Sequence, residues 1–265
     1  MTRPPDFGPT APLAPPIYPA AVYTFPDLDA LDAVYARDAP GFVYARDGHP
    51  NARHLADELT RLEGAAWGTV AASGMGAIAA ALVALVSTGG RVVASDRLYG
   101  KTTRLLRDHL GRLGVATAFA DFTDLDAVRA AVAAAPTAVL FAETLSNPLC
   151  RVADLPALAE VAHAAGARLV VDNTFATPVL CRPLELGADV VVESLTKLVA
   201  GHSDVTLGYV GGTDPALGPA VAGCVSTWGA PASPFDCWLA SRGLETLDLR
   251  VRAAAANAAA AAEFL

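Results

Sequence analysis

From about residue 66 onward, the chain alternates short apolar runs with longer amphipathic stretches, and this pattern limits the folds open to it. Short buried strands separated by helices form an α/β domain whose sheet is mostly parallel. Helical stretches lie between most of the runs, for example at 124–134 and 155–165. We expect strands at 91–95, 115–120, 138–142, 168–172, 189–193 and 206–210.

The two ends of the chain follow other patterns. Residues 1–26 are rich in proline and glycine, which predicts an extended arm. Helical spacing of apolar residues follows at 28–37 and 51–62, with Pro50 placed to begin the second helix. Near the other end, 234–243 and the alanine-rich 245–265 predict two further helices.

Composition and charge argue against several classes of protein. A hydrophobic content of 53% argues against a disordered chain. A net charge of −8 without a basic stripe argues against nucleic-acid binding. The longest apolar stretch, 77–86, is about half of the roughly 20 residues that span a bilayer, and the proline-rich start is unlike a secretory signal. We therefore expect no membrane segment.

The cysteines and histidines point the same way. Four cysteines lie far apart and form no C-x-x-C pair, which is typical of cytosolic thiols, so we expect a cytoplasmic protein. The histidines form no H-E-x-x-H pair, so we expect no metal site.

Lysine is scarce in this chain. Lys and Arg together number 19, yet the only lysines are Lys101 and Lys197. Of the two residue types, only lysine loses its proton near neutral pH and acts as an amine nucleophile. Each lysine is therefore a candidate for chemistry as well as for simple surface charge.

In open α/β sheets, ligands bind at the carboxyl ends of the strands. In this chain the loops that follow short apolar runs and lead to helices are 73–76, 143–148, 172–178 and 194–204. These four loops are the candidate site.

The loop Ser73-Gly74-Met75-Gly76 precedes an apolar helix expected at 77–86. Glycines let the backbone approach an anion, and a helix N-terminus offers free N–H groups, so a phosphate site is one reading. The segment also matches G-x-G-x-x-A, with Asp96 about 20 residues on, so a NAD-dependent oxidoreductase is an alternative. A glycine turn needed only for packing is a third.

The other loops favour a different cofactor. Asp172 ends a predicted strand, where a carboxylate holds a protonated ring nitrogen or a metal, or caps the following turn. Ser194 and Thr196 flank Lys197, and their hydroxyls suit phosphate oxygens. Pyridoxal phosphate requires a lysine, a carboxylate partner for its ring nitrogen and a phosphate cup. These loops supply all three, whereas hydride transfer leaves Lys197 unexplained.

The segment VVDNTFATPVLCRPLELGADVVVESLTKLVAGHSD resembles the signature of the Cys/Met-metabolism family of pyridoxal-phosphate enzymes, the trans-sulfuration family related to cystathionine γ-synthase. The resemblance runs from about Pro16 to the end, through YAR, LEG, SGMGAI, DRLYGKT, ETLSNP and RGLETL. It implies a fold-type-I transferase large domain. The implied activity is elimination or replacement at the β- or γ-carbon of sulfur amino acids or O-acylhomoserine.

The resemblance also implies roles for residues. Lys197 would bind the cofactor covalently and move the α-proton, and Asp172 would hold the ring nitrogen charged. Tyr99 would stack on the ring and assist proton transfer, and Asn147 would lie near the ring oxygen and the substrate carboxylate. The implied phosphate ligands are Gly74, Met75, Ser194 and Thr196. Tyr44 and Arg46 would reach the phosphate of a neighbouring subunit, which implies a homo-oligomer, a dimer or a tetramer.

Three features depart from the family pattern. Residues 47–51 read DGHPN where the family has an Asn-Pro-Thr-like stretch. Lys101 replaces a small residue, and it either faces solvent or adds a second cation near the cofactor. The family's C-terminal domain, with the arginine that grips the substrate carboxylate, has no counterpart. Arg242, Arg250 and Arg252 match the interdomain helix and are not assigned that role.

We accordingly expect three parts: an N-terminal arm and inter-subunit segment at 1–50, a cofactor-binding α/β domain at 51–243, and the start of a long helix at 244–265. A cofactor-binding homologue without full catalytic activity is the main alternative to a working enzyme. The residues do not choose among γ-synthase, γ-lyase, β-lyase and sulfhydrylase.

Overall fold

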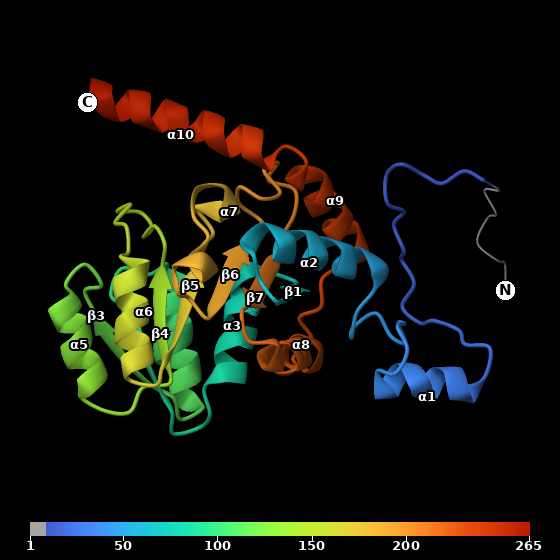
Figure 1. Cartoon of the computed structure of the whole chain (residues 1–265), viewed down its shortest axis with the longest axis horizontal. Helices are drawn as coiled ribbons and strands as arrows, with labels where there is room; N and C mark the ends of the chain where they lie inside the picture. The colour runs from blue at the N-terminus through green and yellow to red at the C-terminus, as the bar shows by residue number, and fades with distance from the viewer. Residues whose placement is uncertain (1–8) are drawn as a thin grey trace.

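A seven-stranded sheet in the order β1-β7-β6-β5-β4-β2-β3 forms the centre of the computed structural model, which describes residues 9–265 (Figure 1). The strands are β1 (Trp67–Ala71), β2 (Arg91–Ser95), β3 (Ala116–Ala120), β4 (Val139–Glu143), β5 (Arg168–Asp172), β6 (Val190–Ser194) and β7 (Gly208–Gly212). β7 alone is antiparallel to its neighbours. The carboxyl ends of the other six therefore emerge at one edge of the sheet.

The central strands are apolar because helices cover both faces of the sheet. Alternate residues of one strand enter different cores: Val190 and Val192 face one side of the sheet, and Val191 faces the other. The six predicted strands are confirmed within two residues, the largest shift being at β7. The prediction of a mostly parallel α/β sheet is also confirmed.

Two helical layers enclose the sheet. One face is covered by α2 (Pro50–Glu63), α5 (Leu125–Ala133) and α6 (Leu155–Ala164), and the other by α3 (Gly74–Leu85), α8 (Gly218–Thr227) and the π-helical η1 (Leu105–Leu110). Smaller helical elements complete the layers: α4 (Gly100–Arg104), α7 (Thr177–Leu180), η2 (Pro183–Leu186) and η3 (Pro215–Leu217). The sequence pattern did not identify α4, α7 or α8.

Local signals explain where two of these helices begin. Pro50 is the first residue of α2, as predicted, and the buried His49 caps the helix by accepting the Ala52 N–H at its Nδ1, 3.1 Å away. The stretch 47–51, which departs from the family pattern, thus has a structural role, because it begins α2. α3 begins at Gly74, three residues earlier than predicted, because the Ser73 hydroxyl accepts the Gly76 N–H at 3.0 Å.

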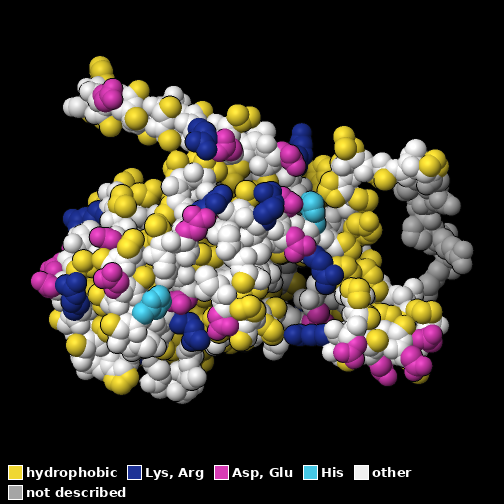
Figure 2. Space-filling view, viewed as in Figure 1, with side chains coloured by type: hydrophobic (Ala, Val, Ile, Leu, Met, Phe, Trp, Pro, Cys, Tyr) yellow, Lys and Arg dark blue, Asp and Glu magenta, His cyan; other side chains and the backbone are white. Residues whose placement is uncertain are grey.

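The ends of the chain lie against the domain at few points. In Figure 1 the N-terminal arm and α1 (Leu28–Ala36) stand to one side, and α10 (Leu247–Phe264) extends away from the sheet beyond α9 (Pro234–Leu244). The Trp238 indole of α9 donates a hydrogen bond to the Pro15 carbonyl, 2.9 Å away. Figure 2 shows apolar side chains along the arm.

Within residues 9–265, no helix is both long and apolar enough to cross a membrane. No group of three or more acidic, histidine or cysteine side chains in that range is arranged to hold a metal ion.

The sheet order overturns the dinucleotide alternative. In that fingerprint, the strand before the glycine loop and the strand before the acidic residue belong to one βαβ unit and lie close together. Here β1 precedes the glycines and β2 precedes Asp96, yet four strands separate them. Neighbouring strands lie about 4.8 Å apart, so the two loops are roughly 24 Å from each other across the sheet. Asp96 instead forms an exposed ion pair with Arg97 at 3.4 Å.

Candidate active site

The glycine loop and the lysine loop meet at the carboxyl edge of the sheet. Gly74 packs directly on Ser194, and a Cβ built at Gly74 would lie 2.6 Å from the Ser194 Cβ. Only glycine allows this approach. The free N–H groups at the start of the 12-residue α3 therefore lie beside a serine hydroxyl, and the first turn of the helix carries no acidic residue. This arrangement suits a phosphate dianion.

Asp172 is connected to the same place through Thr174. The Thr174 hydroxyl donates to Asp172 Oδ1 at 2.5 Å and accepts the Ser194 N–H at 2.8 Å, and the Thr174 N–H also reaches Oδ1 at 3.0 Å. Asp172 thus caps the turn that follows it, which is one of the roles predicted for it from the sequence. Its Oδ2 has no hydrogen-bond partner among residues 9–265 and is available to a ligand.

Electrostatics around Asp172 favour a cationic ligand. Burial raises the pKa of the Asp172 carboxyl above its ordinary value, and the hydrogen bonds from Thr174 oppose that shift. A protonated ring nitrogen at Oδ2 would add a positive charge, which favours the ionised carboxylate. The chemistry of this acid therefore fits a pyridinium partner.

Lys197 lies in the turn that follows β6, and its side chain is exposed. Its amine has no hydrogen-bond or ion-pair partner among the described residues, so it is free to react. Thr196, which precedes it, uses its hydroxyl on the backbone of Leu207, accepting the N–H at 3.2 Å and facing the carbonyl at 3.3 Å. Thr196 thereby joins the turn after β6 to Leu207, the residue before β7. Lys101 is exposed, in keeping with the prediction that it faces solvent.

Glu143 is a site residue to which the sequence analysis gave no role. It ends β4, lies beside Asp172 in the strand register, and is buried. Its carboxyl group accepts the backbone N–H of Tyr99 at 2.6 Å and that of Asn147 at 3.3 Å. Burial raises the pKa of Glu143 to about 7, and the neighbouring Asp172 charge adds to the shift. The sequence signal that could have identified Glu143 is its position as the acidic first residue of the strand-end loop 143–148.

Through Glu143, two predicted residues from separate loops are held at one carboxyl group. Tyr99 and Asn147 both have exposed side chains, so they border the open space at this edge of the sheet. Met75 lies close to the Tyr99 loop, with its sulfur 4.0 Å from the Thr102 hydroxyl. The carboxyl-edge cluster, defined as Gly74, Asp172, Ser194, Lys197 and Glu143, is thus adjoined by both loops.

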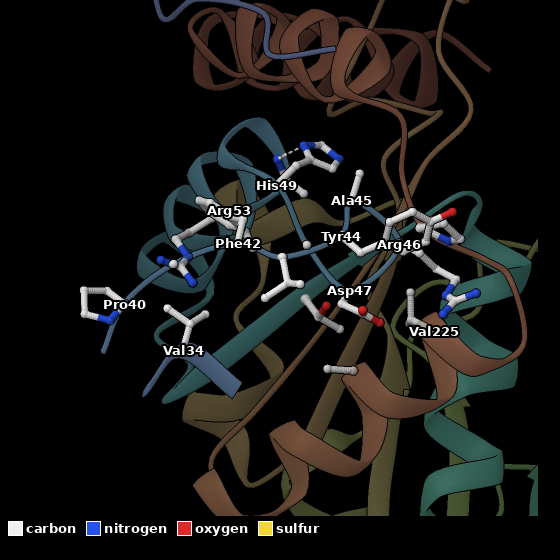
Figure 3. A pocket seen from close by; sticks show the side chains of 18 of the residues that line it. Val34, Pro40, Phe42, Tyr44, Ala45, Arg46, Asp47, His49, Arg53 and Val225 are labelled. Atoms are coloured by element: carbon white, nitrogen blue, oxygen red, sulfur yellow. Dashed lines mark hydrogen bonds between the residues drawn. The ribbon is translucent and has the colours of Figure 1, made fainter. Parts of the chain in front are cut away.

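Tyr44 and Arg46 lie elsewhere in the protomer. They line a cavity of about 800 Å³ between α1 and the segment that follows it, α2, β1 and α8 (Figure 3). The Arg46 guanidinium is 5.1 Å from the centre of the Tyr44 ring, and both side chains are exposed. None of the carboxyl-edge cluster lines this cavity. The structure therefore does not bring these two residues to Lys197 within one chain.

Among the described residues, the site offers an amine without a partner, a strand-end carboxylate with a free oxygen and a helix N-terminus beside a hydroxyl. Pyridoxal phosphate requires these three groups. Their meeting at one edge of this sheet defines the class of fold-type-I pyridoxal-phosphate-dependent enzymes. Comparison with family models narrows the class. The chain belongs to the family described as "Cys/Met metabolism PLP-dependent enzyme", whose model matches residues 4–265.

Individual relatives agree with this assignment. The chain is 41% identical to L-methionine gamma-lyase of Pseudomonas putida over 96% of its own length and 64% of that protein's. It is 43% identical to cystathionine gamma-synthase of Mycobacterium tuberculosis over 85% of its own length and 58% of that protein's. The chain thus spans less than two thirds of these relatives.

A solved structure from Campylobacter jejuni carries N'-pyridoxyl-lysine-5'-monophosphate. It superposes with a TM-score of 0.83 at 31% identity, covering 89% of this chain and 66% of that one. The predicted family, fold class and cofactor are therefore confirmed.

Proposed function

We propose that this chain holds pyridoxal phosphate at Lys197 and takes part in elimination or replacement at the β- or γ-carbon of sulfur amino acids or O-acylhomoserine. The observation that carries the proposal is the unpartnered Lys197 amine on the turn after β6, beside the Asp172–Thr174–Ser194 hydrogen-bond chain. The names of the relatives, a methionine gamma-lyase and a cystathionine gamma-synthase, support the substrate class.

When bound, pyridoxal phosphate supplies an electron sink for negative charge that develops at the substrate α-carbon. Within the proposal, Asp172 keeps the ring nitrogen protonated through its free Oδ2. The α3 N-terminus, Gly74, Met75, Ser194 and Thr196 bind and orient the phosphate. Lys197 would hold the cofactor covalently through its amine, and that amine would also move the substrate α-proton as a base.

Glu143 orients the other two groups by holding their backbones. Tyr99 would stack on the ring and move a proton at the leaving group, and Asn147 would bind near the substrate carboxylate. Both assignments are supported by the shared acceptor, Glu143, which holds the two loops in one geometry.

The proposal includes a homo-oligomer, a dimer or a tetramer, in which Tyr44 and Arg46 of one subunit complete the phosphate site of another. An arginine suits a phosphate dianion because it binds in a bidentate manner. This reading is supported by the cavity that Tyr44 and Arg46 line, to which no residue of the carboxyl-edge cluster of their own chain contributes. A cytoplasmic location is also proposed, in line with four cysteines that are all free thiols.

The visible absorption spectrum of the purified chain with pyridoxal phosphate tests the first part. A lysine-bound cofactor gives a yellow band, and we expect the band in the natural chain and its absence in Lys197→Ala. No band with folded natural protein would overturn the proposal. Release of a 2-oxo acid from L-methionine, L-cystathionine or O-acylhomoserine then tests the reaction. A band without turnover would favour the cofactor-binding homologue that lacks full activity.

A further inference from the structure

Arg250, near the start of α10, directs its polar contacts within residues 9–265 toward backbone and hydroxyl oxygens. Nη1 donates to the Leu198 carbonyl at 2.6 Å, and Nη2 donates to those of Val199 at 3.0 Å and Gly243 at 2.8 Å. Nε donates to the Thr246 hydroxyl at 3.0 Å. Leu198 and Val199 are the two residues that directly follow Lys197. The guanidinium therefore joins the lysine turn to the junction between α9 and α10.

Gly201 shows how closely the turn fits beneath this side chain. Its φ is +74°, and a Cβ built there would lie 2.2 Å from Arg250 Nη1. Its N–H donates to the Lys197 carbonyl at 2.9 Å, and the Ala200 N–H donates to the Leu195 carbonyl at 2.9 Å. These two bonds close the turn from within, and Arg250 holds it from outside.

An ordinary surface arginine behaves differently, as Arg252 on the same helix shows. Its Nε pairs with the Asp248 carboxylate at 2.8 Å, one helical turn away, and both side chains are exposed. Arg250 is half-buried and has no carboxylate partner among the described residues. Partial burial lowers the pKa of Arg250, because the position that reaches the lysine turn removes part of the water around the guanidinium. A cation paired only with neutral oxygens serves to fix the groups that it binds.

We propose that Arg250 is a positioning residue for Lys197. It fixes the backbone after the lysine, so the position of α10 sets how the amine is presented. This inference rests on the proposed function only for the role of Lys197; the fixing of the turn stands on the hydrogen bonds alone. Lysine in place of arginine keeps the charge but reaches fewer carbonyls, because it lacks the planar fork.

The first test needs no cofactor. Hydrogen exchange of the backbone amides of Ala200 and Gly201 is compared in the natural chain, Arg250→Ala, Arg250→Lys and the control Arg252→Ala. Loss of charge-assisted bonds makes local opening easier, so we expect Arg250→Ala to exchange about tenfold faster. Arg250→Lys should be intermediate, and Arg252→Ala should match the natural chain.

The second test uses the chain loaded with pyridoxal phosphate. Hydroxylamine captures the cofactor from lysine, and the decay of the yellow band reports how firmly Lys197 is held. We expect this decay to be about tenfold faster in Arg250→Ala than in the natural chain or Arg252→Ala, because the fixed turn hinders local opening. The apparent pKa of the band, followed by absorbance, should also shift in Arg250→Ala alone.

The outcomes separate the two claims. No band in the natural chain defeats the proposed function, and the exchange experiment still decides whether Arg250 fixes the turn. A band in the natural chain with Arg250→Ala equal to Arg252→Ala in both experiments overturns the role of Arg250. If Arg250→Ala does not fold, Arg250→Lys decides by the same two measurements, and natural behaviour of that variant would contradict the need for a fork of donors.

Discussion

Two carboxyl groups, those of Glu143 and Asp172, determine much of the charge at the carboxyl edge of the sheet. Glu143 and Asp172 end neighbouring parallel strands in register, and burial raises the pKa of both. Glu143 accepts a backbone N–H at each of its two oxygens, and Asp172 accepts two donors from Thr174 at Oδ1, so neither acid is isolated in the protein. Their proximity means that a positive ligand at Asp172 also eases the ionisation of Glu143.

Replacing Glu143 with glutamine tests its control of the Tyr99 and Asn147 loops. The ionised carboxylate accepts both N–H groups, whereas the amide nitrogen of glutamine faces one of them as a second donor. Because the folded pKa is raised to about 7, the ionised form dominates only above that pH. We expect kcat/KM of the natural chain to fall below pH 7 and Glu143→Gln to be reduced about tenfold, consistent with loss of one charged hydrogen bond. In Glu143→Gln, kcat/KM should no longer fall as the pH drops below 7.

The folding free energy has the opposite dependence on pH. An acid with a raised folded pKa contributes stability that is present at low pH and lost as the pH rises through about 7. Urea unfolding between pH 5 and 8 therefore provides a check that is independent of activity. A fall in kcat/KM below pH 7 that persists in Glu143→Gln would contradict the role assigned to this group.

Helices and strands meet at a second acidic pair behind the site. Glu63 ends α2 and Glu193 lies on β6; both side chains are buried, and each acts on the pKa of the other. The Asn173 amide donates to Glu63 Oε1 at 3.0 Å, while Glu63 Oε2 and both oxygens of Glu193 have no hydrogen-bond donor among the described residues. Burial raises the pKa of both acids. We expect the two acids to share one proton, which would satisfy this pair and join α2 to the sheet.

Glu193→Gln should therefore stabilise the fold at high pH. The amide supplies the missing donor to Glu63 without an ionisable proton. Since the folded pKa values are raised, the natural pair loses stability as the pH rises above the usual range of a carboxyl group. We expect a gain of about 1–3 kcal/mol in unfolding free energy at pH 8 and a smaller gain at pH 5. Urea unfolding measures both.

An exposed glutamate provides the control for that measurement. Glu160 lies on α6 at the surface, so Glu160→Gln should leave the pH dependence as it is in the natural chain. If Glu193→Gln were destabilised equally at pH 5 and 8, the shared proton would be refuted.

At the scale of the whole molecule, the arm and α10 extend beyond the domain that holds the site. Tyr44 and Arg46 line a cavity away from Lys197, and few residues of α10 are buried, among them Leu247 and Val251. Both regions expose apolar side chains, including Tyr35 at 66% and Leu249 at 70%. Surfaces of this kind are commonly covered by another chain or segment.

Mixing two inactive variants tests whether sites are shared between copies. Arg46→Ala loses the proposed phosphate contact, and Lys197→Ala loses the amine. In a mixed dimer, one of the two sites would combine an intact Lys197 with an intact Arg46. Random pairing then restores about a quarter of the sites. Each variant incubated alone is the control, and a mixture as inactive as its components would contradict sharing.

Periodicity and turn residues are enough to predict many of the strands and several of the reactive residues of this protein. Buried strands such as 91–95 and 168–172 are recognisable because helices on both faces demand continuous apolar runs. Lys197, Asp172 and Gly74 are recognisable because a scarce amine, a strand-end acid and a helix-opening glycine follow local rules. The missed α8 has little periodicity, with only Val221 and Val225 buried.

The order of the strands was decided only by tertiary structure, because pairing joins segments far apart in the chain. That order rejected the dinucleotide fingerprint, which is locally complete at Gly74–Asp96. The roles of Glu143, of the Glu63–Glu193 pair and of Arg250 also depend on it. Each acts through a residue at least 44 positions away, and a contact of that kind leaves no periodic trace in the sequence. The sequence by itself therefore determined most of the elements and several of the reactive groups, and the fold decided which groups meet.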